Sequence, residues 1–436
     1  MLMTVVAIAF EAVAVATAMP AAGADLGQMS LYAWTFTAFV IGMALATVLA
    51  GRVADRHGPI LPTMAGLALF GAGLVLAALA WTMPVLLVAR FVQGLGGGGF
   101  NVALMVVVAR TFEPARRAWM MTAFSVCWVL PAFLAPPVAA WLTEKLSWHW
   151  VFGALVPVVV IAAALVIGPL RMLAEQLRPD SGGNAAPVPV WAAVVASVGV
   201  ALVQVAGQRT EWRSLLWLAL GLVALAVSLR LLMAPGFFQF RPGIAAVSWT
   251  RALQAGSFFA AEAFLPLSLT TVREVSLFEA GLMLTIGSVG WTTGSFLQAR
   301  ARWRRDQLIV AGTVCSLAGI ALIAASTHLG WSIVAIGGGW TVAGLGMGLA
   351  TASGSLAVMT LSEPAQIGRN TGSLNLSEAL GNALFIGLAG AIYANLRHQV
   401  VPAETFGWVF VAAAAVALAS VASALRVGPV VEPARA

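Results

Sequence analysis

Fourteen stretches of mostly apolar residues follow one another along the chain, and each is about 20 to 30 residues long. A helix needs this length to cross the hydrocarbon core of a bilayer, and in lipid only helices and closed barrels satisfy all their backbone hydrogen bonds internally. The predicted spans are residues 2–22, 31–51, 60–81, 84–109, 118–142, 150–169, 188–207, 214–233, 244–270, 278–299, 307–327, 331–360, 370–394 and 405–425. The pattern predicts an all-α membrane protein with fourteen transmembrane helices.

Composition and charge support a membrane protein and give it an orientation. The chain is 61% hydrophobic and 9% charged, with a mean hydropathy of +0.96, whereas about a quarter of the residues of a soluble domain are charged. With the N-terminus inside, sixteen of the 23 Lys and Arg residues fall on the cytoplasmic side, where such residues are enriched. We therefore expect a multi-pass protein of the cytoplasmic membrane with both termini in the cytoplasm. The net charge of +7 then reflects topology and anionic lipids, and no nucleic acid partner is expected.

The two halves of the chain repeat each other. The fourth span contains Gly94-Leu-Gly96, and the twelfth contains Gly344-Leu-Gly346. Such weak symmetry is expected of two six-helix bundles related by an axis along the membrane normal. The seventh and eighth spans are then an inserted pair, although a single hairpin split in two is an alternative. The predicted domains are a first bundle at 1–170, a cytoplasmic linker at 171–187, the inserted pair at 188–236 and a second bundle at 237–436.

A charged turn between the second and third spans points to a known family. Gly51, Asp55, Arg56 and Gly58 match the spacing of Gly-x-Leu-Ala-Asp-Arg-x-Gly-Arg-Lys, and this segment resembles the signature of the major facilitator superfamily. The resemblance implies that Arg52, Asp55 and Arg56, with Gly58 ending the turn, form a conformational gate. The alternative is an ordinary basic turn, which any cytoplasmic loop of a membrane protein can contain.

Three further segments resemble one group within that superfamily. Residues 90–96 read Arg-Phe-Val-Gln-Gly-Leu-Gly, and residues 10–20 keep the spacing of an acidic residue to a proline found in the first helix of the group. Residues 147–152 read Ser-Trp-His-Trp-Val-Phe, while 135–140 carry Ala-Pro-Pro-Val-Ala-Ala where the group has Gly-Pro-x-x-Gly-Gly. Segment 135–140 departs from the pattern of the group. With its fourteen spans and the other three segments, the chain resembles the drug:proton antiporters. The resemblance implies a major facilitator fold, two six-helix bundles plus two extra central helices, and a role for Arg90 in proton coupling.

Three glutamates lie within predicted spans and are candidates for proton coupling. Glu11 lies about 14 Å along the first span, near the middle of a core about 30 Å thick. An ionised carboxylate there costs at least ~2.5 kcal/mol, so it must face water, pair with a cation or hold a proton. Function is favoured for Glu11 and Glu262, which occupy the first helices of the two bundles. For Glu378 a local hydrogen-bonded clasp is an equal alternative. Arg90 is expected to act as a counter-charge to a carboxylate such as Glu11, and snorkelling to the interface is its alternative.

Further polar and aromatic residues are candidates for a substrate cavity. They are Gln93, Asn101, Trp128, Arg251, Gln254, Trp291 and Asn375. Arg251 is expected to meet Glu378 or a substrate anion, or to snorkel toward the cytoplasm. For Asn101 and Gln254 a hydrogen bond between helices is the commoner role. For the tryptophans, core packing or an interfacial belt is the commoner role.

No motif in the sequence indicates an enzyme. The chain has four scattered histidines, no phosphate-binding Gly-x4-Gly-Lys-Ser/Thr loop and no Ser/His/Asp arrangement. The two cysteines lie inside spans, so neither a metal site nor a cofactor is expected, and the coupling ion would be the proton.

The resemblance implies a proton-coupled secondary transporter that exports hydrophobic or cationic drug-like compounds by alternating access. Its partners would be the small-molecule substrate, protons and membrane lipids, and a monomer is expected. The alternatives are an exporter of a lipid or endogenous natural product, and a non-transporting receptor on the same fold.

Overall fold

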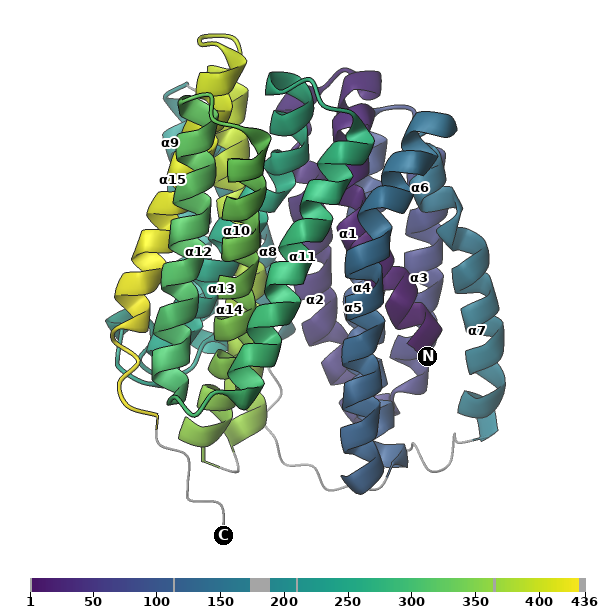
Figure 1. The fold of residues 1–436 in the computed structure, drawn as a ribbon. Coiled ribbons are helices and arrows are strands. Elements are labelled where there is room, and N and C mark those ends of the chain that lie inside the picture. Colours follow the sequence, from purple (N-terminus) through teal and green to yellow (C-terminus); the bar gives the residue numbers. More distant parts are fainter. Residues whose placement is uncertain (1, 113, 173–188, 209–210, 364–365, 431–436) are drawn as a thin grey trace. The chain divides into compact units, whose positions relative to one another are not determined.

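The structure is a computed structural model that describes residues 2–112, 114–172, 189–208, 211–363 and 366–430. These residues are almost entirely helical (Figure 1). The helices are α1 (Leu2–Leu26), η1 (Met29–Leu31), α2 (Trp34–His57), α3 (Ile60–Ala78), α4 (Met83–Thr111), α5 (Pro114–Lys145), α6 (His149–Gly153), α7 (Leu155–Met172), α8 (Val190–Gly207), α9 (Arg213–Leu232), η2 (Phe237–Gln239), α10 (Ile244–Val272), α11 (Leu277–Arg300), α12 (Arg305–His328), α13 (Ile333–Leu361), α14 (Ile367–Leu396) and α15 (Pro402–Ala424).

A helix occupies each of the fourteen predicted spans. Among the described residues, 12 helical segments are long and apolar enough to cross a membrane, and α6 with α7 makes one of them. The remaining two spans are occupied by α5, with 32 residues, and α11, with 24 residues. At 1.5 Å per residue both are long enough to cross a hydrocarbon core of about 30 Å. The chain is thus an all-helical, multi-pass membrane protein.

The charged segment after the second span is helical, which corrects the prediction of a turn there. Helix α2 continues to His57, so Arg52, Asp55 and Arg56 lie on its last turns. The chain reverses only at Gly58, whose φ of 83° is a conformation that glycine adopts without a steric penalty. A helix can continue beyond the hydrocarbon core of the bilayer, because its backbone hydrogen bonds are internal.

The chain forms two compact units, Met1–Ser197 and Val198–Ala436. The boundary falls within α8, and the second unit contains most of the predicted inserted pair together with α10 to α15. Residues 173–187 of the predicted linker lie outside the described residues.

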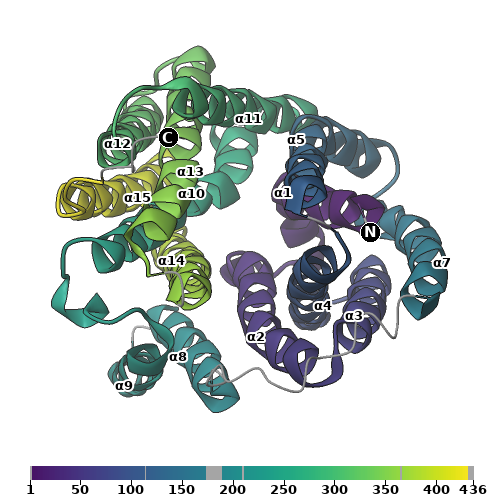
Figure 2. The ribbon, with the colours of Figure 1, turned by 90° about the horizontal axis from the view of Figure 1, so that it is seen from below.

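Both units pack their helices in the same pattern. In the first unit α4 packs between α2 and α3, and α1 packs along α5. In the second unit α13 packs between α11 and α12, and α10 packs along α14. The sixth helix of each set, α7 or α15, contacts both the first and the third. Figure 2 shows these neighbours end-on within each unit. The sequence repeat therefore corresponds to a structural repeat.

Three glycines let α4 approach its neighbours closely. A Cβ atom at Gly94 or Gly98 would collide with backbone atoms of α2, and a Cβ at Gly96 would collide with α3. The two faces alternate because positions i and i+4 lie on one side of a helix. Small residues at such contacts allow close helix packing where the lipid supplies no hydrophobic driving force.

Helix α13 repeats this arrangement 250 positions later. Gly344 and Gly348 contact α11 in the same way, and Gly346 contacts α12. The two helices also have the same length, 29 residues. The shared offset relates every position of α4 to a counterpart on α13.

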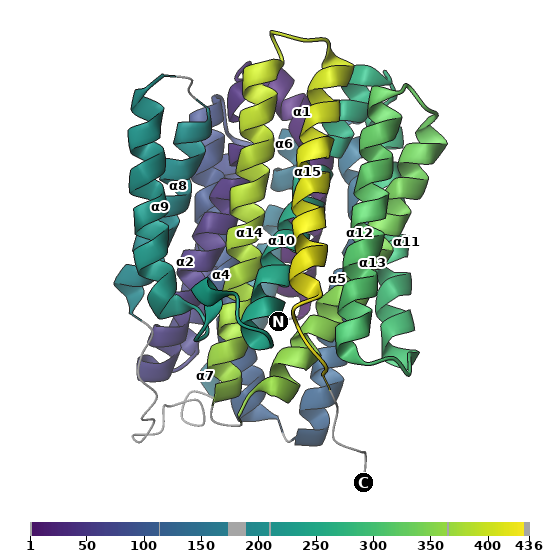
Figure 3. The same cartoon turned by 90° about the vertical axis from the view of Figure 1, so that its left-hand side faces the viewer.

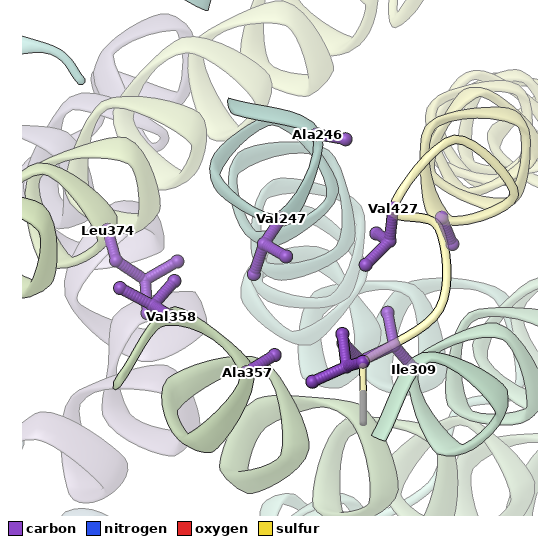
Figure 4. Packing of buried hydrophobic residues seen from close by; sticks show 9 residues of the cluster. Ala246, Val247, Ile309, Ala357, Val358, Leu374 and Val427 are labelled. Carbon is purple, nitrogen blue, oxygen red and sulfur yellow. The ribbon is translucent and has the colours of Figure 1, made fainter. Parts of the chain in front are cut away.

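A hydrophobic cluster closes one end of the second unit (Figure 4). It joins the first turns of α10, α12 and α14 to the last turns of α13 and α15. Its members are Ala246, Val247, Ile309, Ala357, Val358, Leu374, Ala424, Val427 and Val430. Two hydrogen bonds fix the segment after α15. Gly243 N donates to the backbone oxygen of Val427 at 3.0 Å, and Val430 N donates to the side-chain Oδ1 of Asp306 at 3.0 Å.

The close approach of α13 and α11 predicts that the same substitution has different effects on stability at two positions of α13. Gly344→Ala should destabilise the protein by about 1–3 kcal/mol, because the new methyl group meets the carbonyl of Gly287. Gly338→Ala is the matched control, since no atom lies within 4 Å of its Cβ position, and it should be neutral or stabilising. Thermal unfolding of the purified protein measures both. Equal melting temperatures for the two variants would contradict the packing described for α13.

Candidate functional site

A buried ion pair joins α1 to α4 in the first unit. The carboxylate of Glu11 has no exposed surface, and the side chain of Arg90 is 3% exposed. The guanidinium of Arg90 forms an ion pair with Glu11, as the sequence predicts for a counter-charge. Two charges in a low-dielectric interior are tolerated when they compensate each other.

Further contacts orient Arg90. Its Nε donates to the carbonyl oxygen of Thr35 at 2.9 Å, and its Nη1 donates to Oε1 of Gln93 at 2.7 Å. Its guanidinium also lies 4.6 Å from the ring centroid of Phe39, within the range of a cation–π interaction. The close contact at Gly94, one turn along α4, brings the α2 backbone within reach of these groups. The arginine is therefore held by three helices at once.

A second ion pair joins α10 to α14 in the second unit. Arg251 Nη1 lies 3.0 Å from Glu378 Oε2, which is the pairing expected from the sequence. Its Nη2 donates to Ser355 Oγ at 2.9 Å and to the carbonyl oxygen of Thr351, both on α13. The side chain of Arg251 is 5% exposed, whereas that of Glu378 is 28% exposed. One end of this pair is therefore accessible and the other is not.

An aromatic cluster lies beside Glu262 on α10. Phe258 stacks on Trp340 with centroids 4.4 Å apart, and it meets Trp291 edge-on at 5.5 Å. Phe259 contacts Trp291 at 6.3 Å. Glu262 lies one turn after the two phenylalanines, and helical side chains lean toward the preceding turn, so its carboxylate shares their face.

Glu262 itself is partly exposed. In the part of the chain that the structure describes, it forms no ion pair and no hydrogen bond. A carboxylate without a cation beside aromatic rings is an arrangement that can bind a cationic, aromatic ligand.

Comparison with known proteins identifies the family. The family model described as Major Facilitator Superfamily matches residues 1–261. This chain belongs to the Major Facilitator Superfamily. Among similar curated proteins, Multidrug resistance protein 3 of Bacillus subtilis (strain 168) is 28% identical over 308 residues, which are 68% of this chain and 60% of that protein. Multidrug transporter protein MdtP of the same organism is 30% identical over 222 residues, 50% of this chain and 40% of that protein. The chain thus matches less than two thirds of the length of either relative.

Solved structures of several transporters have a similar fold. A peptide transporter POT in complex with sulfate aligns with a TM-score of 0.70 at 17% identity, over 98% of this chain and 94% of that one. A bacterial homologue of the human lysosomal transporter Spinster, in an inward-facing and occupied conformation, aligns with a TM-score of 0.65 at 15% identity, over 97% and 94% of the two chains. At these identities the likeness concerns the fold alone.

The superfamily fold places the other predicted cavity residues in different surroundings. Gln93 is fully buried and contacts Arg90, so in this conformation it orients the arginine. Gln254 is 3% exposed and donates to Ser316 Oγ and to the carbonyl of Gly346, both at 3.1 Å. It therefore clasps α10 to α12 and α13, which is the alternative stated for it.

Three predicted cavity residues have open surroundings. Asn101, Trp128 and Asn375 are exposed, on α4, α5 and α14 respectively. The charged end of α2 is also open, since Asp55 and Arg56 are exposed and form no ion pair within the described residues. Their assignments to a cavity and a gate stay predictions.

Several residues of these sites were not predicted from the sequence. Phe258 and Phe259 precede Glu262 by four and three positions, a spacing that could have revealed the shared face. Trp340 lies 250 positions after Arg90, so the glycine repeat could have marked it as the counterpart of the arginine. Thr35 could not have been found, because it contributes only a backbone carbonyl.

The buried pair predicts strong energetic coupling between Glu11 and Arg90. Glu11→Gln should destabilise the protein by about 3–5 kcal/mol, because the guanidinium loses its buried counter-charge. The double variant Glu11→Gln/Arg90→Gln should be more stable than the sum of the two single changes, since neither charge is then left alone. Chemical or thermal unfolding of the four proteins measures this cycle. Additive effects would show that the two side chains do not interact.

Proposed function

We propose that this superfamily member is a proton-coupled secondary transporter. It exports hydrophobic or cationic drug-like compounds across the cytoplasmic membrane by alternating access of its two bundles. It acts as a monomer with both termini in the cytoplasm, and it uses the proton as its coupling ion without a resident cofactor. The observation that carries the proposal is the Glu11–Arg90 ion pair, buried within membrane-spanning helices. The names of the similar multidrug proteins of B. subtilis support the substrate class.

The buried pair provides a site for proton exchange. With Arg90 in contact, the charge of Glu11 is compensated and the carboxylate needs no proton. If the helices shift so that the contact breaks, an ionised carboxylate in the membrane interior becomes costly, and taking up a proton removes that cost. Proton uptake and release by Glu11 would then follow the conformation of the first unit. Glu378, paired with Arg251 and partly exposed, is a second candidate of the same kind.

The aromatic cluster of the second unit provides a substrate site. Trp291 and Phe259 offer ring faces to a planar or apolar compound, and Glu262 offers a negative charge to a cationic one. Neutral hydrophobic compounds would use the rings alone. The predicted cavity residues Asn101, Trp128 and Asn375 would line the transport path.

The charged end of α2 is the proposed gate. Arg52, Asp55 and Arg56 lie on its last turns, where they can form and break ion pairs as the bundles move. Asp55→Asn should then slow transport without weakening substrate binding, and normal transport rates in this variant would exclude a gating role.

The experiment that tests the proposal measures proton movement in proteoliposomes. Vesicles that are acidic inside and contain a pH-sensitive dye are mixed with a panel of lipophilic cations and neutral drugs. The wild-type protein should release protons when a substrate is added, and Glu11→Gln should reduce this flux at least about tenfold, the effect of about 1.4 kcal/mol. Glu11→Asp keeps the charge and should retain part of the flux.

The matched control is Glu404→Gln, the same change at an exposed position in the first turn of α15. It should transport like the wild type. Undiminished flux in Glu11→Gln would exclude this residue as the coupling site. A wild-type protein that gives no flux with any compound would instead favour export of a lipid or natural product, or a receptor role.

A further inference from the structure

A strongly basic turn joins α11 to α12 in the second unit. Residues 300–306 read Arg-Ala-Arg-Trp-Arg-Arg-Asp, so they hold four arginines and one aspartate, a net charge of +3. The turn lies between two predicted membrane spans, at the predicted membrane surface. Figure 3 shows it at the same end of the second unit as the segment after α15. The turn has no part in the proton or substrate sites described above.

Two of the four arginines are held by the protein itself. Arg304 binds Asp306 through two hydrogen bonds, Nε to Oδ1 at 3.1 Å and Nη2 to Oδ2 at 2.7 Å. Asp306 also accepts the amide of Val430, which ties the turn to the segment after α15. Arg305 Nη1 donates to Oε1 of the buried Gln298 at 3.0 Å. These contacts fix the turn and compensate the charge of its one carboxylate.

The other two arginines are open to a ligand. The side chains of Arg300 and Arg302 are exposed and form no ion pair within the part of the chain that the structure describes. The guanidinium of Arg300 lies 3.8 Å from the ring centroid of Phe296, one turn earlier on α11. Stacking on a ring holds a guanidinium in place without using the N–H donors at its edge.

Exposed apolar side chains accompany these two arginines. Phe296 and Leu297 are exposed near the end of α11, and Trp303 is 62% exposed within the turn. On a membrane-spanning helix such side chains contact lipid, and tryptophan favours the level of the headgroups. Basic side chains at the membrane surface attract anionic headgroups. The turn therefore offers an apolar surface and two unpaired cations to the same layer of the bilayer.

The surroundings of the turn are positive as well. Among the described residues, one further carboxylate lies at this end of the second unit, that of Glu363 after α13, and it accepts a hydrogen bond from Gln366 at 3.0 Å. Residues 431–436, outside the described residues, contain one glutamate and one arginine, so these side chains add no net charge. The helix ends and loops at this end carry four more arginines, namely Arg230, Arg241, Arg369 and Arg426. An anion is therefore attracted to the turn, and a cation is repelled.

We propose that the turn between α11 and α12 binds the phosphate of one anionic glycerophospholipid. Arg300 and Arg302 hydrogen-bond the phosphate oxygens, for which the planar guanidinium has a matching geometry. Trp303 lies at the level of the headgroup, and Phe296 and Leu297 contact the acyl chains.

Two features of the turn select this ligand. A lipid fits better than a soluble anion, because apolar side chains flank the two unpaired arginines. An anionic lipid fits better than a zwitterionic one, because Asp306, the carboxylate of the turn, is already bound to Arg304 and cannot pair with an ammonium group. The site is independent of the transport mechanism and would hold even if the protein moves no drug.

The test is native mass spectrometry of the full chain, titrated with phosphatidylglycerol or phosphatidylethanolamine of the same acyl composition. The wild-type protein should retain one phosphatidylglycerol at least about tenfold more tightly than phosphatidylethanolamine. The double variant Arg300→Gln/Arg302→Gln should reduce this preference to less than about threefold, because both phosphate donors are lost. Arg302→Gln alone should reduce it part of the way. Since both side chains are exposed, the variants should melt at the temperature of the wild type.

The matched control is Arg213→Gln in the first turn of α9, which removes an exposed arginine that also lies over an aromatic ring, that of Trp212 at 5.8 Å. It should keep the lipid preference. Equal retention of the two lipids by the wild-type protein would overturn the proposal. A preference that survives the double variant, or one that falls equally in Arg213→Gln, would also overturn it. Displacement of phosphatidylglycerol by glycerol phosphate at equal concentration would make the turn a site for soluble anions instead.

Discussion

The close approach of helix backbones at glycine is the constraint on which both units depend. Gly94 and Gly98 bring α2 against α4, and Gly344 and Gly348 bring α11 against α13. In a membrane, packing of this kind replaces the hydrophobic driving force that holds soluble helices together. The short distance between the backbones also determines which groups of the neighbouring helix a side chain one turn from the glycine can contact. Arg90 contacts the carbonyl of Thr35 because α2 lies so near.

The same backbone frame carries different chemistry in the two units. Trp340 on α13 occupies the position that corresponds to Arg90 on α4. Arg90 forms an ion pair with Glu11, whereas Trp340 stacks on Phe258. The residue that each side chain contacts on the neighbouring helix also differs. Arg90 lies over the ring of Phe39 on α2, whereas Trp340 lies against Gly287 on α11. At this position one unit therefore buries a charge, and the other buries an aromatic ring. Under the proposed function, proton coupling at Glu11 belongs to the first unit and cation recognition beside Glu262 to the second, and Glu378 is a further candidate for coupling in the second unit.

Much of the architecture could be predicted from the sequence, because length and apolarity decide which segments cross a membrane. The pairs Glu11–Arg90 and Arg251–Glu378 could also be anticipated, since a charge in a span needs a partner. The helical end of α2 could not, because it depends on the backbone conformation at Gly58. Contacts made by backbone carbonyls, such as that of Thr35, leave no mark in the sequence.

The most direct test of this division of roles is proton release from the purified protein on addition of a lipophilic cation, recorded together with cation affinity. In weakly buffered detergent solution, the account predicts that Glu11→Gln abolishes proton release while retaining cation affinity within about threefold. Glu262→Gln should lower the affinity for the cation at least about tenfold, a loss of about 1.4 kcal/mol of binding free energy. It should leave the affinity for neutral compounds unchanged. Proton release that persists in Glu11→Gln and disappears in Glu262→Gln would contradict the account and place both functions in the second unit.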